Sequence, residues 1–174
     1  RTMMAAACSR VTVALGAISS LASGVPGGAG TVTTAGSPQT GTITNDDSAT
    51  LTLSSVSATN LEGNSGTTAF TFQVALSHDV QGGVSVAYAT NDGTATTADG
   101  DYVDNDGTLT FPGTAGTQTI TVLVNGDTKV EANEQFTVAL GAISGLAAGV
   151  PGGTGTITTA GSPQAGTITN DDSA

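Results

Sequence analysis

Apolar and polar residues alternate along most of the chain after residue 49, with a period of two residues rather than 3.6. The stretch FTFQVAL (70–76) places two phenylalanines, a valine and a leucine on one face, and VSVAY (84–88), TITVLV (119–124) and FTVAL (136–140) follow the same rule. Threonine and valine are frequent in these stretches, which suits half-buried strands. No stretch shows the apolar stripe of an amphipathic helix. The pattern therefore predicts an all-β protein.

Glycine, proline, asparagine and aspartate fill the gaps between the alternating stretches and mark the turns. The predicted strands cover residues 50–60, 68–77, 83–90, 102–111, 117–125, 135–143 and 155–169. The alternating apolar residues of these strands form the candidate core: Leu51, Leu53, Phe70, Phe72, Val74, Leu76, Val84, Val86, Tyr88, Leu109, Phe111, Ile120, Val122, Val124, Phe136, Val138, Leu140, Ile157 and Ile168. Short strands at this spacing predict a seven-stranded antiparallel immunoglobulin-like β-sandwich.

The chain contains a long internal repeat. Residues 12–49 recur as residues 137–174 and differ at only five of 38 positions, all of them small or conservative exchanges. Matches of this density are the signature of a tandem array. We therefore interpret residues 1–48 as the C-terminal remnant of a preceding repeat, comprising its last two strands, and residues 49–174 as one complete domain.

The charge of the chain narrows the possible partners. Fourteen acidic residues stand against three basic ones, giving a net charge of −11. Such a surface repels nucleic acid phosphates and anionic lipid headgroups, so its natural partners are cations. No apolar run approaches the ~20 residues of a membrane-spanning helix, and we expect no direct membrane insertion.

The few histidines and cysteines also limit the chemistry. Cys8 is the single cysteine, so no intrachain disulfide can form. Residues 49–174 contain one histidine, His78, and no cysteine, so neither a catalytic triad nor a dyad can be assembled. We therefore expect a protein that is not an enzyme.

The acidic residues are unevenly distributed over the predicted loops. In a sandwich whose consecutive strands run in opposite directions, alternate loops meet at the same end. Asp79 is the one acid in the loops of one end, whereas Asp104 and Asp106 lie along a predicted strand and cannot be assigned to either. The loops of the other end carry nine: Glu62, Asp92, Asp99, Asp101, Asp127, Glu131, Glu134, Asp171 and Asp172.

So many like charges in one loop cluster repel one another unless a cation neutralises them. Ca²⁺ accepts about 6–8 oxygen ligands at roughly 2.3–2.6 Å in forgiving geometry. Zinc prefers His and Cys, and magnesium keeps its waters, so both suit this cluster less well. The alternative is a solvated acidic surface without an ion. Asp92 and Asp99, in NDG and ADG, are also typical turn formers.

Six motifs in order resemble those of the Calx-β domain: EG (62–63), YATNDGTATTADGDY (88–102), GTLTF (107–111), TITVLVNGD (119–127), EANEQFTVAL (131–140) and GTITNDD (166–172). The resemblance implies a seven-stranded sandwich that binds Ca²⁺ at one end. By position, the family's calcium ligands fall on Glu62, Asp101, Asp127, Glu131, Glu134, Asp171 and Asp172. Gly126 and Asn170 stand where calcium-sensing members can have further acids, which implies fewer ions or looser binding.

The resemblance leads to a functional hypothesis. Calx-β domains occur in sodium–calcium exchangers, in an integrin β subunit and as arrays in large bacterial surface or secreted proteins. The repeat favours the bacterial array, at the cell surface or outside the cell, where Ca²⁺ would stiffen the domain end and the junction to neighbouring repeats. Such a parent protein could be an adhesin with protein or glycan ligands. The alternatives are an ion-free spacer or adhesive module, and a regulatory calcium-sensing domain of a membrane protein.

Overall fold

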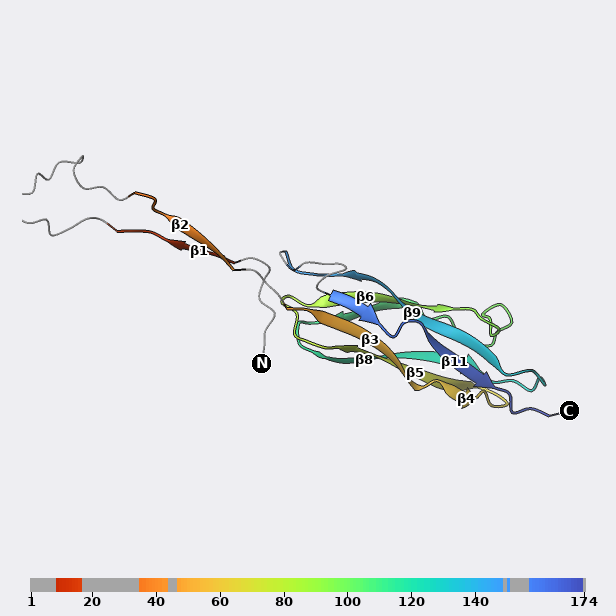
Figure 1. The fold of residues 1–174 in the computed structure, drawn as a ribbon. Coiled ribbons are helices and arrows are strands. Elements are labelled where there is room, and N and C mark those ends of the chain that lie inside the picture. Colours follow the sequence, from red (N-terminus) through yellow and green to blue (C-terminus); the bar gives the residue numbers. More distant parts are fainter. Residues whose placement is uncertain (1–8, 17–34, 44–46, 149, 151–156, 174) are drawn as a thin grey trace, which may run out of the picture. The chain divides into compact units, whose positions relative to one another are not determined.

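The computed structural model describes residues 9–16, 35–43, 47–148, 150 and 157–173, shown as coloured ribbons in Figure 1. These residues form strands and loops, with no helix among them. Accordingly, no helix in the described segments is long and apolar enough to cross a membrane. The chain divides into two compact units, with the boundary between Asn45 and Asp46.

The larger unit consists of two sheets that enclose one core. The four-stranded sheet has the order β10 (Ile157–Ala160), β3 (Ala49–Ser57), β5 (Thr67–Leu76), β8 (Gly116–Asn125). The five-stranded sheet has the order β4 (Thr59–Leu61), β11 (Gln164–Thr169), β9 (Glu134–Ser144), β6 (Val84–Asn91), β7 (Gly107–Phe111). The predicted all-β sandwich is confirmed. Its strand pairs are antiparallel except for β10 with β3 and β11 with β4, which are parallel.

The core follows the alternation of the sequence. Of the apolar residues predicted to face inward, Tyr88 and Leu140 are partly buried and all the others are buried. Phe136 lies at the centre of an aromatic cluster, with ring centroids 5.7 Å from Phe70, 6.2 Å from Phe72 and 4.8 Å from Tyr102. Since aromatic side chains bury large apolar areas, this cluster holds the two sheets together.

Three predicted strands are not continuous. The strand predicted at 50–60 is interrupted at Ala58, and its parts β3 and β4 lie in different sheets. The strand predicted at 155–169 becomes β10 and β11, again in different sheets, while residues 155–156 lie outside the described part. Gly161 permits this second crossing because its φ is +68° and its backbone passes so close to Leu53 that an added Cβ would lie 2.2 Å from the Leu53 carbonyl oxygen.

The strand predicted at 102–111 is also shorter in the structure, where only Gly107–Phe111 pairs as β7. Tyr102 instead forms an isolated antiparallel bridge with Val124 of the other sheet. The Val103 N–H donates to the Leu123 carbonyl at 2.8 Å. The backbone before β7 therefore bonds to the four-stranded sheet, which alternation of apolar residues does not reveal.

The smaller unit contains a hairpin of β1 (Ser9–Val13) and β2 (Gln39–Ile43). Its strands pair in the same register as β9 and β11, with every residue number lower by 125. Ser9 lies opposite Ile43 in the first hairpin, just as Glu134 lies opposite Ile168 in the second. A side-chain contact recurs as well. Ser37 Oγ accepts from Leu15 N at 2.9 Å, and Ser162 Oγ accepts from Leu140 N at 2.8 Å. The two copies therefore form the same hairpin where both are described.

The aromatic cluster yields a first prediction. Phe136→Ala removes the ring at its centre, and we expect a loss of about 3–5 kcal/mol in the free energy of unfolding, measured by urea denaturation. Val11→Ala is the matched control because Val11 occupies the same register position in the hairpin of the smaller unit. It should leave the sandwich transition unchanged. A loss below about 1 kcal/mol for Phe136→Ala would contradict the assigned role.

Candidate metal centre

Four segments that are far apart in the sequence meet at one end of the sandwich. They are the β4–β5 loop (62–66), the β6–β7 loop (92–106), the β8–β9 loop (126–133) and the residues after β11 (170–173). Backbone hydrogen bonds tie them together: Glu62 N to Thr169 O at 3.3 Å, Gly126 N to Gly66 O at 3.1 Å and Asn125 N to Asp101 O at 2.9 Å. The loops predicted to gather at one end therefore do so.

The first carboxylate group comprises Glu62, Asp171 and Asp172, and is called the Glu62 group below. One carboxylate oxygen of each lies within 4.8 Å of the others. Glu62 is buried, with 6% of its surface exposed. Asp171 Oδ1 accepts from Gly63 N at 3.1 Å, and Asp172 Oδ1 accepts from the Asn64 side chain. Asp172 Oδ2 is buried and has no hydrogen-bond partner among the described residues.

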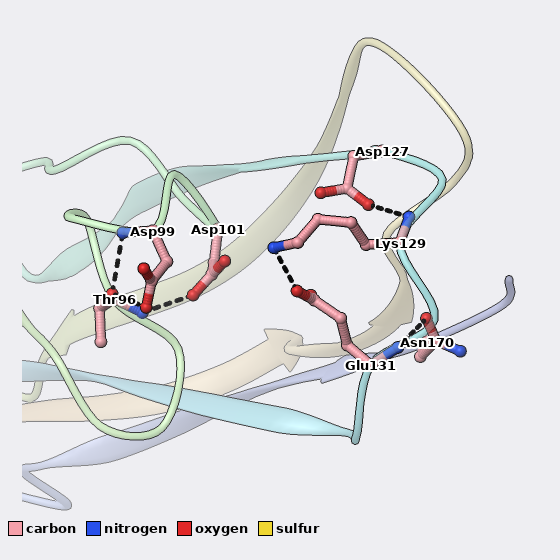
Figure 2. Close-up of polar contacts among 7 residues, drawn as sticks. All are labelled: Thr96, Asp99, Asp101, Asp127, Lys129, Glu131 and Asn170. Atoms are coloured by element: carbon pink, nitrogen blue, oxygen red, sulfur yellow. Dashed lines mark hydrogen bonds and ion pairs between the residues drawn. The ribbon is translucent and has the colours of Figure 1, made fainter.

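The second group comprises Asp101, Glu131 and Glu134, and is called the Glu134 group. These three half-buried carboxylates also each offer an oxygen within 4.8 Å of the others. Asp101 Oδ2 accepts from Thr96 N at 2.7 Å, which fixes the side chain at the base of its loop. Figure 2 shows the Asp101 loop facing the segment that carries Glu131.

Lys129 is the single basic residue of positions 49–174. Its ammonium forms an ion pair with Glu131, and Figure 2 shows it on the side of the loop that faces Asp101. The Glu131 hydrogen bond raises the pKa of Lys129, and the charges of Glu131, Asp127 and Asp101 raise it further. One exposed ammonium is thus paired with one carboxylate and is also influenced by the charges of two others.

Asp127 is the predicted ligand that belongs to neither group. Its Oδ1 accepts from the backbone N–H of Lys129 at 2.6 Å, as Figure 2 shows. Its charge is nevertheless felt by Glu62, whose pKa it helps to raise. The structure therefore brings six of the seven predicted residues together in two groups, with Asp127 beside them.

Burial, together with mutual repulsion, shows in the pKa values of two carboxyls. Burial raises the pKa of Glu62 from its ordinary value of 4.5, with further contributions from Asp127, Glu131, Asp172 and Asp171 in that order. Burial likewise raises the pKa of Glu134 to about 7, and the charge of Asp101 adds to the effect. Both carboxyls are less easily ionised in the folded chain, because negative charge there lacks sufficient compensation.

The residues fit a hard divalent cation. Two oxygens on opposite sides of Ca²⁺ at about 2.4 Å lie about 4.8 Å apart, and each group places its oxygens within that distance of one another. Every donor in both groups is a carboxylate, which suits Ca²⁺ and not Zn²⁺. The unpartnered buried oxygen of Asp172 adds an independent sign, because such an atom is costly unless a ligand satisfies it.

Two asparagines also connect the loops at this end, and an argument from charge does not identify them because their side chains are neutral. Asn170 accepts from Glu131 N at 3.3 Å and donates to the Asp172 carbonyl at 3.1 Å. Its own backbone N–H donates to Asn133 Oδ1 at 3.2 Å. Asn170 thus ties the β8–β9 loop to the end of β11. In the sequence, the positions of Asn133 and Asn170 next to acidic residues are the feature that could have indicated this role.

Gly126 occupies a position where an acid cannot stand without a backbone shift. An added Cβ would lie 2.1 Å from the Gly63 carbonyl oxygen and 2.9 Å from that of Glu62. A side chain at this position therefore requires the β4–β5 loop to move away.

Asp92 and Asp99 lie outside both groups and act within their loop, as the turn-former interpretation predicts. Asp92 Oδ1 accepts from Thr97 N at 3.0 Å and from the Tyr102 hydroxyl at 2.6 Å, and these bonds lower the pKa of Asp92. Asp99 Oδ2 accepts from Thr96 Oγ1 at 3.1 Å.

Asp104 and Asp106, which the sequence could not assign, also lie outside both groups. The Thr90 N–H donates to Asp106 Oδ1 at 2.9 Å, and the Thr90 hydroxyl donates to Asp104 Oδ1. Both acids thus hold the segment before β7 against β6.

The sandwich and its acidic loop cluster define a small all-β domain with a candidate cation site at one end. The family model described as the Calx-beta domain matches residues 45–162, and the chain belongs to this family. The resemblance in the motifs is thereby confirmed. Asp171 and Asp172 lie beyond the matched range.

Solved structures point the same way. A crystal structure of the apo form of the Calx CBD1 domain is 27% identical, with a TM-score of 0.54, and the match covers 70% of this chain and 98% of that one. CBD12 from CALX1.2 gives the same identity and TM-score over 70% of this chain and 44% of its own. The calcium binding domain CBD12 of CALX1.1 is 27% identical, with a TM-score of 0.50, and the match covers 71% of this chain and 44% of that one. No curated protein sequence matches this chain.

The raised pKa of Glu134 predicts an unusual pH dependence without calcium. Between its unfolded value of 4.5 and about 7, the folded chain binds more protons than the unfolded chain, so stability falls as pH rises. In EDTA, we expect the melting temperature to fall by several degrees between pH 5 and pH 8. Besides burial, the negative charges of Asp101, Glu131 and Asp99 contribute to the raised pKa of Glu134.

Glu134→Gln should flatten this dependence and raise the melting temperature at pH 8. Asp79→Asn is the matched control at the opposite end, where the side-chain oxygen still accepts from Ala115 N. It should leave the slope unchanged. A melting temperature that rises over the same window would contradict the prediction.

Proposed function

We propose that this chain is a calcium-binding, non-catalytic module, with Ca²⁺ held by the Glu62 and Glu134 groups. The observation that carries the proposal is the convergence of six carboxylates from four distant segments on two clusters. Membership in the Calx-beta family supports it, as does the similarity to a structure named as a calcium binding domain.

The proposed chemistry is cross-linking rather than catalysis. An ion in the Glu62 group would join the end of β11 to the β4–β5 loop. An ion in the Glu134 group would join the β6–β7 loop to the β8–β9 loop. Asp127 is placed to add its charge to the Glu62 group. Burial and repulsion together raise the pKa of Glu62 and Glu134, and a bound cation would compensate their buried charge and so stabilise the folded domain.

We further propose that the module belongs to a tandem array in a bacterial surface or secreted protein. Residues 1–48 would then be the last two strands of the preceding repeat, and Ca²⁺ at the end of β11 would stiffen the junction between repeats. The near-identity of the two copies and the shared register of their hairpins support this organisation. Neighbouring repeats would be the direct partners, and protein or glycan ligands would belong to the parent protein.

Calcium addition tests the central proposal. Extracellular calcium modules typically bind with Kd of about 10⁻⁴–10⁻³ M. At one hundred times Kd the gain in stability is about 2.7 kcal/mol, so Ca²⁺ should raise the melting temperature by several degrees relative to EDTA. Asp171→Asn and Glu131→Gln should each reduce the shift, whereas Asp79→Asn at the opposite end should keep it.

The same titration separates the alternatives. A melting temperature that does not respond to millimolar Ca²⁺ would favour the ion-free spacer. Calorimetric binding in the submicromolar range would favour a calcium sensor. A full shift that persists in both ligand variants would show that the ion binds elsewhere.

Lys129 provides a second, independent test of the site. Its ammonium lies against Glu131, with the charges of Asp127 and Asp101 within range, and an incoming divalent ion would compete with it. Lys129→Gln should therefore tighten calcium binding by roughly two- to fivefold, the equivalent of one exposed ion pair. Lys129→Arg retains the charge and should keep the original affinity in calorimetry. Weaker binding by Lys129→Gln would place the ion away from this loop.

A further inference from the structure

Asn125 and Gly126 join the end of β8 to the β8–β9 loop, and this is the only place in the chain where glycine follows asparagine. Glycine has no side chain to hinder its own backbone nitrogen, and its backbone rotates freely. That nitrogen can therefore reach the carbonyl carbon of the preceding asparagine side chain and close a five-membered ring. Asn125 is thus the asparagine of this chain that is chemically most prone to lose its amide.

In the folded chain, Asn125 is held by the β6–β7 loop. Its side-chain Nδ2 donates to the Gly100 carbonyl, and its backbone N–H donates to the Asp101 carbonyl at 2.9 Å. Asn125 also pairs with Thr67 at the end of the β5–β8 ladder, so its backbone is extended. These contacts fix both the side chain and the backbone dihedral angle that ring closure has to change.

The attacking nitrogen is held by a different loop. The Gly126 N–H donates to the Gly66 carbonyl at 3.1 Å. The Gly63 carbonyl oxygen, from the same β4–β5 loop, packs against Gly126 so closely that an added Cβ would lie 2.1 Å from it. Ring closure requires the Gly126 nitrogen to lose its proton and to turn toward the Asn125 side chain. The β4–β5 loop therefore has to release Gly126 first.

We propose that Asn125 is a site of spontaneous deamidation, protected while the Gly100 and Gly66 carbonyls hold it and Gly126, and reactive when these loops open. In the open state, the deprotonated Gly126 nitrogen bonds to Cγ of Asn125, the Cγ–Nδ2 bond breaks and ammonia leaves. Water then opens the ring at one of its two carbonyl carbons and leaves aspartate or isoaspartate. The reaction needs only water, and the inference does not depend on calcium.

Either product prevents the original contacts from forming again. Aspartate at position 125 presents only acceptors to the Gly100 carbonyl, where the amide donated a hydrogen bond. Isoaspartate adds a methylene to the main chain, so the bond from Gly126 N to Gly66 is out of register. Because deamidation is irreversible, its extent records the time that this end of the sandwich spends open.

Mass spectrometry of the full chain tests the proposal. In EDTA at pH 8, peptide mapping should show deamidation of Asn125 at least about tenfold more slowly in the native chain than in urea, because only the open fraction reacts. In urea, Asn125 should convert before every other asparagine. Asn125→Gln has a longer side chain that cannot close the same ring, and should show no mass gain at this position in either condition.

Gly66→Ala tests the protecting contact itself. Gly66 has a φ of +78°, which alanine adopts only at a cost, so the carbonyl that holds Gly126 should shift. We expect native deamidation to accelerate several-fold while the rate in urea stays the same, and a retained melting transition assigns the acceleration to the folded chain. Gly116→Ala is the matched control at the other end of β8, where a methyl group has room, and should react at the original rate.

Asn125→Asp imitates one product. In EDTA it should lower the melting temperature by a few degrees more than Asn91→Asp, which adds the same charge at an exposed position at the end of β6. Four results would each overturn the proposal: equal deamidation rates in native buffer and urea, no acceleration in folded Gly66→Ala, first conversion at another asparagine in urea, or equal melting of the two aspartate variants.

Discussion

Repulsion among carboxylates is the constraint around which one end of this sandwich is organised. Glu62 and Glu134 are held in surroundings that raise their pKa values, beside further acids and a single ammonium from Lys129. Backbone donors offset part of this charge, as Gly63 N does for Asp171 and Thr96 N for Asp101. The remainder is the driving force that the proposed calcium binding would draw on.

Strand switching brings the charges together. After β3, the chain leaves the four-stranded sheet at Ala58 and continues as β4. Strand β4 then runs parallel to β11 in the five-stranded sheet. Glu62 follows β4 directly and Asp171 comes one residue after the end of β11, which explains why residues 109 positions apart can share one cluster. The parallel pairing of β4 with β11 therefore determines which carboxylates form the Glu62 group.

The sequence could predict what depends on burial and chain direction. Alternation identified the inward faces because a pleated strand buries every second residue. It could not reveal the breaks at Ala58 and Gly161, since apolar alternation survives a change of sheet. Likewise, the alternation of strand direction predicted that the acidic loops would meet at one end. It could not place Asp127 outside both groups or assign Asn170 its bridging role, because those outcomes depend on side-chain direction and individual hydrogen bonds.

The close approach of Gly126 to Gly63 has an evolutionary consequence. A carboxylate at position 126 would add negative charge at this end of the sandwich, yet any side chain there meets the Gly63 carbonyl oxygen at 2.1 Å. A gain in affinity by that route needs a compensating change in the facing loop first. Positions 63 and 126 are thus coupled, and the order in which substitutions arise at this contact decides whether each of them is tolerated.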